Sequence, residues 1–314
     1  MAILAAAGTP QHSGVFTPQI WSTRLLVKFY SATVMASISN TDYSGEIKNQ
    51  GDVVIIRQTP DITIRSYVKN SNLIHQRPSS SVIEFPINLA KYFDFVADDI
   101  DVYQSDIKIM NNWADDASMQ MKIAIEDGSD TDGVFANIYS DAHASNKGAS
   151  AGAKSGDINL GSSGAPLSVT KTDILDVVVD CGTVLSEQNV PETQRWMVVP
   201  VWFCGMVLKS DLKDASLAGD GTSILRNGRI GVIDRFEIFE SNLLYSTTDG
   251  SDTVFHAVVG QKTALSFASQ MTKVEHLDKV ESTFGSIIRG LNVYGYKVLK
   301  TASLIDLYIT KGTA

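Results

Sequence analysis

The chain has 314 residues, of which 44% are hydrophobic, and a formal net charge of −9 at pH 7. This length and composition allow a sizeable core in one large domain or in two closely packed ones. The acidic balance excludes tight, sequence-specific DNA binding, which needs a basic surface, but leaves open weak contact with nucleic acid at high local concentration. No apolar run approaches the roughly 18 to 20 residues of a membrane helix, so no membrane partner is expected.

Only two cysteines, Cys181 and Cys204, occur in the chain, and both stand in apolar surroundings. Two cysteines cannot form a disulfide framework, so we expect buried free thiols. The N-terminus lacks the basic region and the long apolar core of a secretory signal. A reducing compartment fits both observations.

Residues 1–42 are rich in Ser, Thr, Ala and Gly, and only Ile20 to Met35 has a sustained apolar pattern. This predicts an extended arm with a short helical piece. Alternation with a period of two then predicts two strands, one around Ile62 and Ile64 and one from Ile83 to Leu89. Proline cannot donate to a ladder, so Pro86 confines the second strand to an edge or a bulge.

The segment between these strands, Ser66 to Ser81, is polar and cannot bury a face of its own. It predicts a long hairpin that projects from a body. Apolar residues from Ile107 to Ile125 then recur at spacings of three and four, which predicts a long helix from about Tyr103 to Glu126. Helical character resumes over Val134 to Ala142.

The next segment, His143 to Leu167, is dominated by Gly, Ser and Ala and predicts a loop. Thr170 to Asp173 resembles a capping box and is followed by an amphipathic pattern over Ile174 to Leu185, which predicts a helix. Val190-Pro191 would end it. Trp196 to Leu208 is strongly apolar and is predicted as a buried strand and its continuation.

The stretch Arg226 to Asn242 mixes charges with β-formers, and it predicts one strand with a charged face, started by a turn at Asn227-Gly228. Gln261 to Met271 predicts another helix. Ser286 to Lys300 and Leu304 to Thr310 predict closing strands. The predicted fold class is mixed α+β, with no internal repeat.

Several short motifs suggest chemistry, but each fits it poorly. Asp127 to Gly133 resembles a calcium loop without its bidentate Glu, and it is interpreted as an acidic turn between helices. Gly148 to Ser155 comes within one residue of a phosphate loop, but no hydrophobic strand leads into it. Ser168 to Lys171 fits the SxxK motif of penicillin-binding enzymes without its companion motifs, so helix capping is favoured. No cofactor or catalytic residue is therefore assigned, although a hydrolase with a noncontiguous site that includes Ser168 stays an alternative.

The histidines are scattered and show no metal-ligand spacing. They are His12, His75, His143, His256 and His276. We therefore expect solvated or structural imidazoles and no metal site.

Six short segments form a series along nearly the whole chain. They are Phe16 to Ser22 with Asn40, Gly45 to Ile47 with Gly51 to Val54, Asp98 to Ser105, Asn189 to Pro200, Gly228 to Gly231 with Glu240 to Asn242, and Ile288 to Gly295. In this order they resemble the major capsid protein of tailed bacteriophages, which has the Hong Kong 97 fold. The resemblance implies a structural protein that forms hexamers and pentamers of an icosahedral shell around a double-stranded DNA genome.

The resemblance also implies a division of the chain. The N-terminal arm is 1–42, the extended loop with its β-hairpin 43–92, the peripheral domain with a long spine helix 93–142 and 275–314, the Gly/Ser-rich loop 143–164, and the axial domain 165–274. No long charged helix precedes the arm, so a fused scaffolding domain is not expected.

The implied partners are other copies of the chain, a portal protein and, weakly and non-specifically, packaged DNA; separate scaffolding and decoration proteins stay open. The implied location is the virion capsid, assembled in the host cytoplasm. The residues expected to act in assembly lie on the extended loop and are Arg65, Tyr67, Lys69, His75 and Arg77. Lys69 is a candidate for covalent cross-linking, although a solvated lysine is favoured. An encapsulin-type compartment, which encloses cargo protein, is the alternative.

Overall fold

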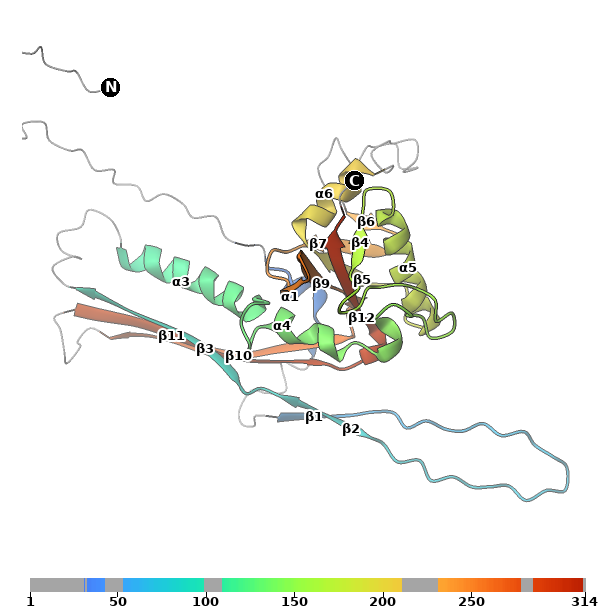
Figure 1. Cartoon of the computed structure of the whole chain (residues 1–314). Coiled ribbons are helices and arrows are strands. Elements are labelled where there is room, and N and C mark those ends of the chain that lie inside the picture. Colours follow the sequence, from blue (N-terminus) through green and yellow to red (C-terminus); the bar gives the residue numbers. More distant parts are fainter. Residues whose placement is uncertain are drawn as a thin grey trace, which may run out of the picture.

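The computed structural model describes residues 31, 33–42, 53–98, 109–210, 231–277 and 285–312. Figure 1 shows a body of mixed helix and sheet, a long helix beside a ribbon of three strands, and a loop that projects away from both. The helices are α1 (Met35–Ile38), α3 (Ile109–Glu126), α4 (Val134–Asn137), α5 (Ile174–Glu187) and α6 (Val201–Lys209), with short 3-10 turns η2 (Ile138–Asp141), η3 (Ala144–Asn146) and η5 (Thr301–Ser303). The strands are β1 (Val53–Arg57), β2 (Val82–Pro86), β3 (Leu89–Asp98), β4 (Leu167–Val169), β5 (Arg195–Val199), β6 (Val232–Ile233), β7 (Phe236–Glu240), β8 (Ser246–Asp249), β9 (Asp252–Gln261), β10 (Leu265–Leu277), β11 (Gly285–Val298) and β12 (Leu304–Lys311). The predicted α+β class is confirmed.

The body is built on a seven-stranded sheet in the order β4-β12-β9-β5-β7-β6, with β8 paired to β9. Strand β5 shows why the sheet is covered on both faces, because all of its residues are buried. Met197 and Val199 pack into a core with α5 and α6, whereas Trp196 and Val198 pack into a second core with α1, α4 and β11. Successive side chains of a strand point to opposite faces, so a continuous apolar run requires two covering layers.

Helix α5 begins at Ile174, where the sequence predicts it, but its start differs from a standard capping box. The Thr170 hydroxyl donates to the Asp173 carboxylate at 2.7 Å and accepts from the Thr172 N–H at 3.3 Å. Asp173 itself stands at the N-cap position. The carboxylate is held at the positive end of the helix, where it is favourable.

A smaller sheet of three long strands, in the order β10-β11-β3, extends away from the body beside α3 (Figure 1). Alternate residues of β3 face the helix, and Phe95 meets Trp113 of α3 edge to face at 5.8 Å between ring centroids. On the same face, Lys91 forms an ion pair with Asp130 in the turn after α3. The helix and the sheet are thereby joined at both ends.

The N-terminal segment is anchored in the second core at the end of α3. Val34, Met35 and Ile38 are buried, and the Glu126 carboxylate accepts the N–H groups of Val34 and Met35, each at 2.9 Å. Residues 1–30 and 32 of the predicted arm, with most of its helical piece over Ile20 to Met35, lie outside the described residues. The last turn of the long predicted helix therefore also holds the segment that leads to β1.

The prediction for Trp196 to Leu208 is correct for the strand and wrong for its continuation. The chain forms β5 and then turns at Pro200 into α6. Pro200 stands at the N-cap position with φ −66°, a value that its ring favours and that leads directly into a helix. The run of apolar residues is the same for a buried strand and a buried helix, so its periodicity does not separate them.

The predicted helix over Gln261 to Met271 is wrong, because residues 265–277 form strand β10. These residues form a strand because they pair with β11, beginning with Leu265 opposite Val298. Long-range pairing of this kind overrides local propensity. The predicted strand around Ile62 and Ile64 is wrong as well, since β2 pairs instead with residues 53–57 and leaves both isoleucines in the loop.

Residues 232–240 of the charged stretch fold as a hairpin of β6 and β7 rather than as the single predicted strand. Asp234 and Arg235 form its turn, with φ of 44° and 69°. Two successive positive φ values are typical of the tight turns that match strand twist. The predicted Asn227-Gly228 turn lies outside the described residues. The predicted strands near the C-terminus are confirmed as β11 and β12.

No helix in the described ranges is long and apolar enough to cross a membrane.

Candidate assembly surfaces

The most exposed feature of the structure is the loop of residues 58–81, which joins β1 to β2 and projects far from the body (Figure 1). Its large apolar side chains face solvent, and Ile64 is 88% exposed. The others are Ile62, Tyr67, Val68, Leu73 and Ile74. Isolated exposed apolar residues are ordinary, but six on one projecting segment indicate a surface that is covered in an assembly.

All five residues predicted to act in assembly lie on this loop, and all are exposed. They are Arg65, Tyr67, Lys69, His75 and Arg77. The loop carries three basic residues and one acidic residue, Asp61, so its formal charge is +2 in a chain of −9. The loop is therefore both apolar and opposite in sign to the rest of the protein.

Few hydrogen bonds hold the two sides of the loop together. Gln58 donates its N–H to the Ser81 carbonyl at 2.9 Å, and the Gln76 side chain bonds both the N–H and the carbonyl of Thr63. Ser71 bonds back to Val68 at the tip. Most other backbone groups of residues 59–80 have no partner among the described residues, and such groups are ready to pair with another chain.

The base of the loop is attached firmly to the small sheet. Phe85 and Ile87 are buried with Ala268 of β10 in a separate apolar cluster. Strand β2 crosses β11 so closely that a Cβ on Gly295 would lie 2.2 Å from the Pro86 carbonyl oxygen. Only glycine allows this approach, so the sequence fixes where the loop leaves the sheet.

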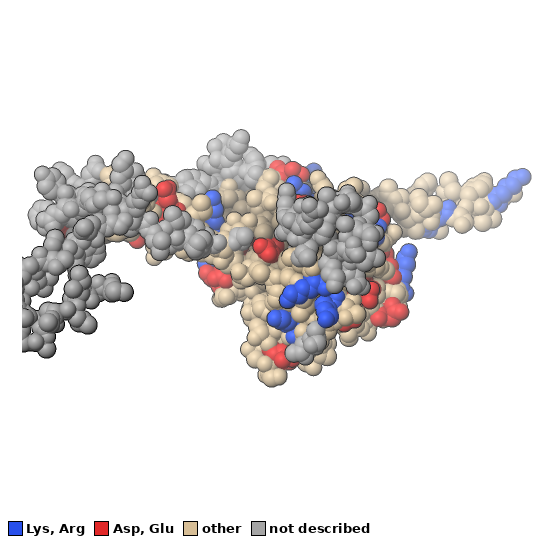
Figure 2. Space-filling model, turned by 90° about the horizontal axis from the view of Figure 1, so that it is seen from above, with Lys and Arg blue, Asp and Glu red and all other residues tan. Residues whose placement is uncertain are grey.

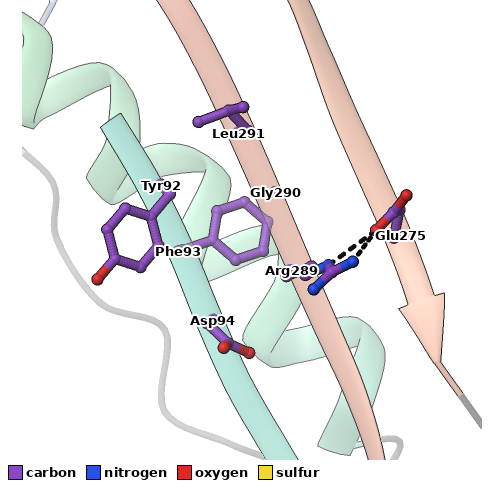
Figure 3. Close-up of a pocket in the computed structure, with 7 residues that line it drawn as sticks. All are labelled: Tyr92, Phe93, Asp94, Glu275, Arg289, Gly290 and Leu291. Carbon is purple, nitrogen blue, oxygen red and sulfur yellow. Dashed lines mark hydrogen bonds and ion pairs between the residues drawn. The ribbon is translucent and has the colours of Figure 1, made fainter. Parts of the chain in front are cut away.

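The outer face of the small sheet is a second exposed surface, shown in Figure 3. Tyr92 is 78% exposed and stands opposite Leu291 in the β3–β11 register. One step along, Asp94 stands opposite Arg289, whose guanidinium donates to Glu275 on β10, with the Nε–Oε2 distance at 2.8 Å. These residues surround a shallow pocket of about 390 Å³. The face combines apolar side chains with the carboxylates of Asp94 and Glu275, of which Glu275 is paired with Arg289.

The motifs that suggested chemistry are structural where the chain is described. Asp127 and Asp130 accept N–H groups of their own turn between α3 and α4, and Asp130 also binds Lys91. The Glu187 carboxylate accepts the N–H groups of Lys154 and Ser155, which lowers its pKa and occupies the amides that a phosphate would need. Ser168 lies in β4, so Lys171 is not one helical turn away from it.

The histidines and cysteines likewise form no catalytic or metal centre among the described residues. His256 Nδ1 contacts the Asp306 carboxylate at 2.9 Å and stacks on Tyr139, in a polar cluster between β9 and β12. No group of three or more metal-ligand side chains occurs in the described ranges. Cys181 and Cys204 are buried and free, and burial raises the pKa of each thiol to about 12.

Sequence reasoning missed two functional features, the outer face of the small sheet and the role of Glu126. The sheet face was hidden because Gln261 to Met271 was predicted as a helix and Glu275 fell outside every predicted strand. The period-two alternation in β3, with Tyr92 and Asp94 on one face, was the available signal.

Comparison with known proteins finds no matching family model and no matching curated protein. Solved structures do match, over nearly the whole chain. A structure from Mycobacterium phage Che8 is 27% identical and has a TM-score of 0.72, over 93% of this chain and 96% of that one. The capsid of cyanophage P-SCSP1u is 14% identical with a TM-score of 0.71, over 95% and 94% of the two chains.

The capsid of Ralstonia phage GP4 is 10% identical with a TM-score of 0.63, over 100% of this chain and 99% of that one. None of these structures is an encapsulin, so nothing in the comparison points to that alternative. They confirm, at the level of the fold, the resemblance that the six sequence segments indicated: the chain has a fold that is found in phage capsids.

Proposed function

We propose that the chain builds the hexamers and pentamers of an icosahedral shell that encloses the double-stranded DNA genome of a tailed phage. The observation that carries this proposal is the match to phage capsids over almost the full length of both chains, together with the match of 27% identity to a structure from Mycobacterium phage Che8. In this proposal the protein is located in the capsid of the virion, and the capsid assembles in the host cytoplasm.

In this proposal the Hong Kong 97 division of the chain applies. The arm is 1–42, the extended loop 43–92, the peripheral domain 93–142 with 275–314, and the axial domain 165–274, with 143–164 as a connecting loop. The small sheet with α3 and the seven-stranded body, each built on its own sheet, are consistent with a peripheral and an axial part.

The extended loop acts between copies. Its three basic residues and its row of exposed apolar side chains pack on the outer sheet face of a neighbour, where the Asp94 carboxylate lies beside Tyr92 and Leu291. Apolar contact supplies the area and charge complementarity sets the register. Arg65, Tyr67, Lys69, His75 and Arg77 are the contact residues in this proposal, and Lys69 serves as an ordinary charged contact.

A shell of this kind needs a portal protein as a partner, and scaffolding and decoration proteins fit the same mode of assembly. Packaged DNA touches the shell weakly and non-specifically, because a net charge of −9 repels the phosphates.

Negative-stain electron microscopy of the purified chain tests the proposal. We expect closed icosahedral shells, or hexamers and pentamers that close on concentration. A chain that stays monomeric under all assembly conditions would refute it. Shells that form only around a co-expressed cargo protein would replace it with the encapsulin alternative.

A further inference from the structure

A basic pocket lies on the seven-stranded body, away from the loop and the small sheet. It has a volume of about 600 Å³ and lies between α6, the end of β12 and the segment before α5. Lys171, Lys209 and Lys311 stand at its rim, one from each of these parts, and Trp202 and Met206 of α6 line its apolar wall. Figure 2, viewed from the side of α6, shows Lys and Arg side chains gathered on this face.

A glycine keeps the pocket open. Gly205 stands in the middle of α6, where glycine is among the poorest helix formers. A Cβ at this position would meet no neighbouring atom within 4 Å, so packing does not require glycine there. A larger residue would strengthen the helix and project into the pocket, which makes the open space the feature that glycine provides.

The tryptophan in the wall is incompletely bonded. The Trp202 side chain packs on the core near Phe203 and Phe255, and its indole N–H is a buried donor that has no acceptor within the described parts of the chain. A buried donor without an acceptor is unfavourable.

We propose that this pocket binds an acidic segment of a partner protein that inserts one large apolar side chain. The three ammonium groups at the rim suit carboxylates, and the wall of Trp202 and Met206 suits an aromatic or aliphatic anchor. A DNA duplex fits less well, because it spans more surface than one pocket and the chain carries a net charge of −9. The pocket shares no residue with the loop or the small sheet, so its occupant binds independently of the loop contact.

The test measures fluorescence anisotropy with the unassembled full chain. The probe is a short labelled peptide of acidic residues around one phenylalanine, compared with the same peptide carrying alanine and with a double-stranded DNA oligonucleotide. Two variants block the pocket: Gly205→Phe fills it, and Lys171→Gln with Lys209→Gln and Lys311→Gln removes its charge. The control variant exchanges Lys122, Lys154 and Lys300, which are exposed elsewhere, for Gln.

We expect the phenylalanine peptide to bind more tightly than the alanine peptide and the DNA. Both pocket variants should weaken it by about tenfold or more, while the control variant stays within about twofold. Equal binding to the wild type and to both pocket variants would overturn the proposal. Tighter binding of DNA through the same lysines would overturn it too, as would self-association of the chain that Gly205→Phe abolishes while no peptide binds.

Discussion

At the scale of single residues, Glu126 holds the N-terminal segment against the end of α3. Its carboxylate is buried at the end of α3, and its two oxygens accept the N–H groups of Val34, which precedes α1, and of Met35, the first residue of α1. Burial raises the pKa of Glu126, and the two backbone donors oppose this by favouring the charged form. The geometry, with one N–H on each oxygen, requires two acceptors, so we take the carboxylate as the bound form near neutral pH.

We predict that Glu126→Gln destabilises the subunit by about 1 to 3 kcal/mol, because the amide nitrogen faces a backbone donor and leaves one N–H unpaired. Urea unfolding of the unassembled subunit measures this. Glu187→Gln is the control, since both backbone N–H groups that Glu187 accepts bond the same oxygen, and an amide oxygen can accept both. An equal or smaller loss at Glu126 than at Glu187 would contradict the anchoring role.

The ion pair between Lys91 and Asp130 predicts that the stability of the subunit depends on pH. The hydrogen bond from Lys91 lowers the pKa of Asp130 below its ordinary value of 3.8. A carboxyl whose pKa is lower in the folded state adds stability above its unfolded pKa and loses it as the pH falls. We therefore expect Asp130→Asn to flatten part of the decline in melting temperature between about pH 5 and pH 3. In a Lys91→Met background the same exchange should flatten the decline less, because only the N–H group of Asp132 still lowers the pKa of Asp130. An equal flattening in both backgrounds would exclude the pair as its main cause.

At the scale of elements, the crossing of β2 over β11 fixes the loop to the sheet. A Cβ at position 295 would lie 2.2 Å from the Pro86 carbonyl oxygen and 2.9 Å from the Ile87 Cα. Gly295→Ala should therefore force the two strands apart and cost about 1 to 3 kcal/mol. Thermal unfolding of the subunit measures the loss. Gly205→Ala is the control, because a methyl group there meets open space, and a Gly295 variant as stable as this control would show that the crossing is loose.

The elements that could be predicted from sequence are those whose local pattern agrees with their final partner. Helix α5 has an apolar stripe and a capping signal at its start, and both survive in the fold. Strands β11 and β12 are flanked by strands that pair along their whole length. In β10 the apolar residues fit either period, so only the distant β11 decides the outcome, and an apolar run such as Trp196 to Leu208 cannot show where Pro200 turns the chain.

Of the candidate surfaces, one could be predicted from the sequence and two could not. The loop was predictable because a polar segment between two strands cannot bury a face, and this holds for Ser66 to Ser81 wherever the chain folds. The outer sheet face and the lysine pocket were not predictable, since Glu275 meets Arg289, and Lys171 approaches Lys311, only after distant strands pair. The local sequence pattern was therefore enough to predict the projecting loop. The outer sheet face and the lysine pocket form only when distant parts of the chain come together.

At the scale of the whole molecule, folding and assembly depend on different parts of the chain. The two large cores lie in and beside the seven-stranded sheet, and no residue of the loop 58–81 belongs to them. The loop instead exposes six large apolar side chains and most of its backbone. A protein that functioned alone would gain nothing from this surface, whereas a shell subunit multiplies the contact over every neighbouring pair of copies.

This separation predicts the result of shortening the loop. Residues 64–75, which lie between the hydrogen-bonded Thr63 and Gln76, are replaced with a short Gly-Ser turn. The unfolding free energy of the subunit should change by about 1 kcal/mol or less, because little buried area is lost and loop closure depends weakly on length. The control keeps the loop and exchanges Arg65, Lys69 and Arg77 for Gln, which should weaken assembly without abolishing the apolar contact.

Sedimentation velocity of the shortened variant, read beside its thermal melt, tests the central claim most directly. The loop contact between copies predicts soluble subunits or isolated capsomers that melt cooperatively near the wild-type temperature and form no closed shells. Closed shells of normal size from this variant would contradict the claim that the loop joins neighbouring copies.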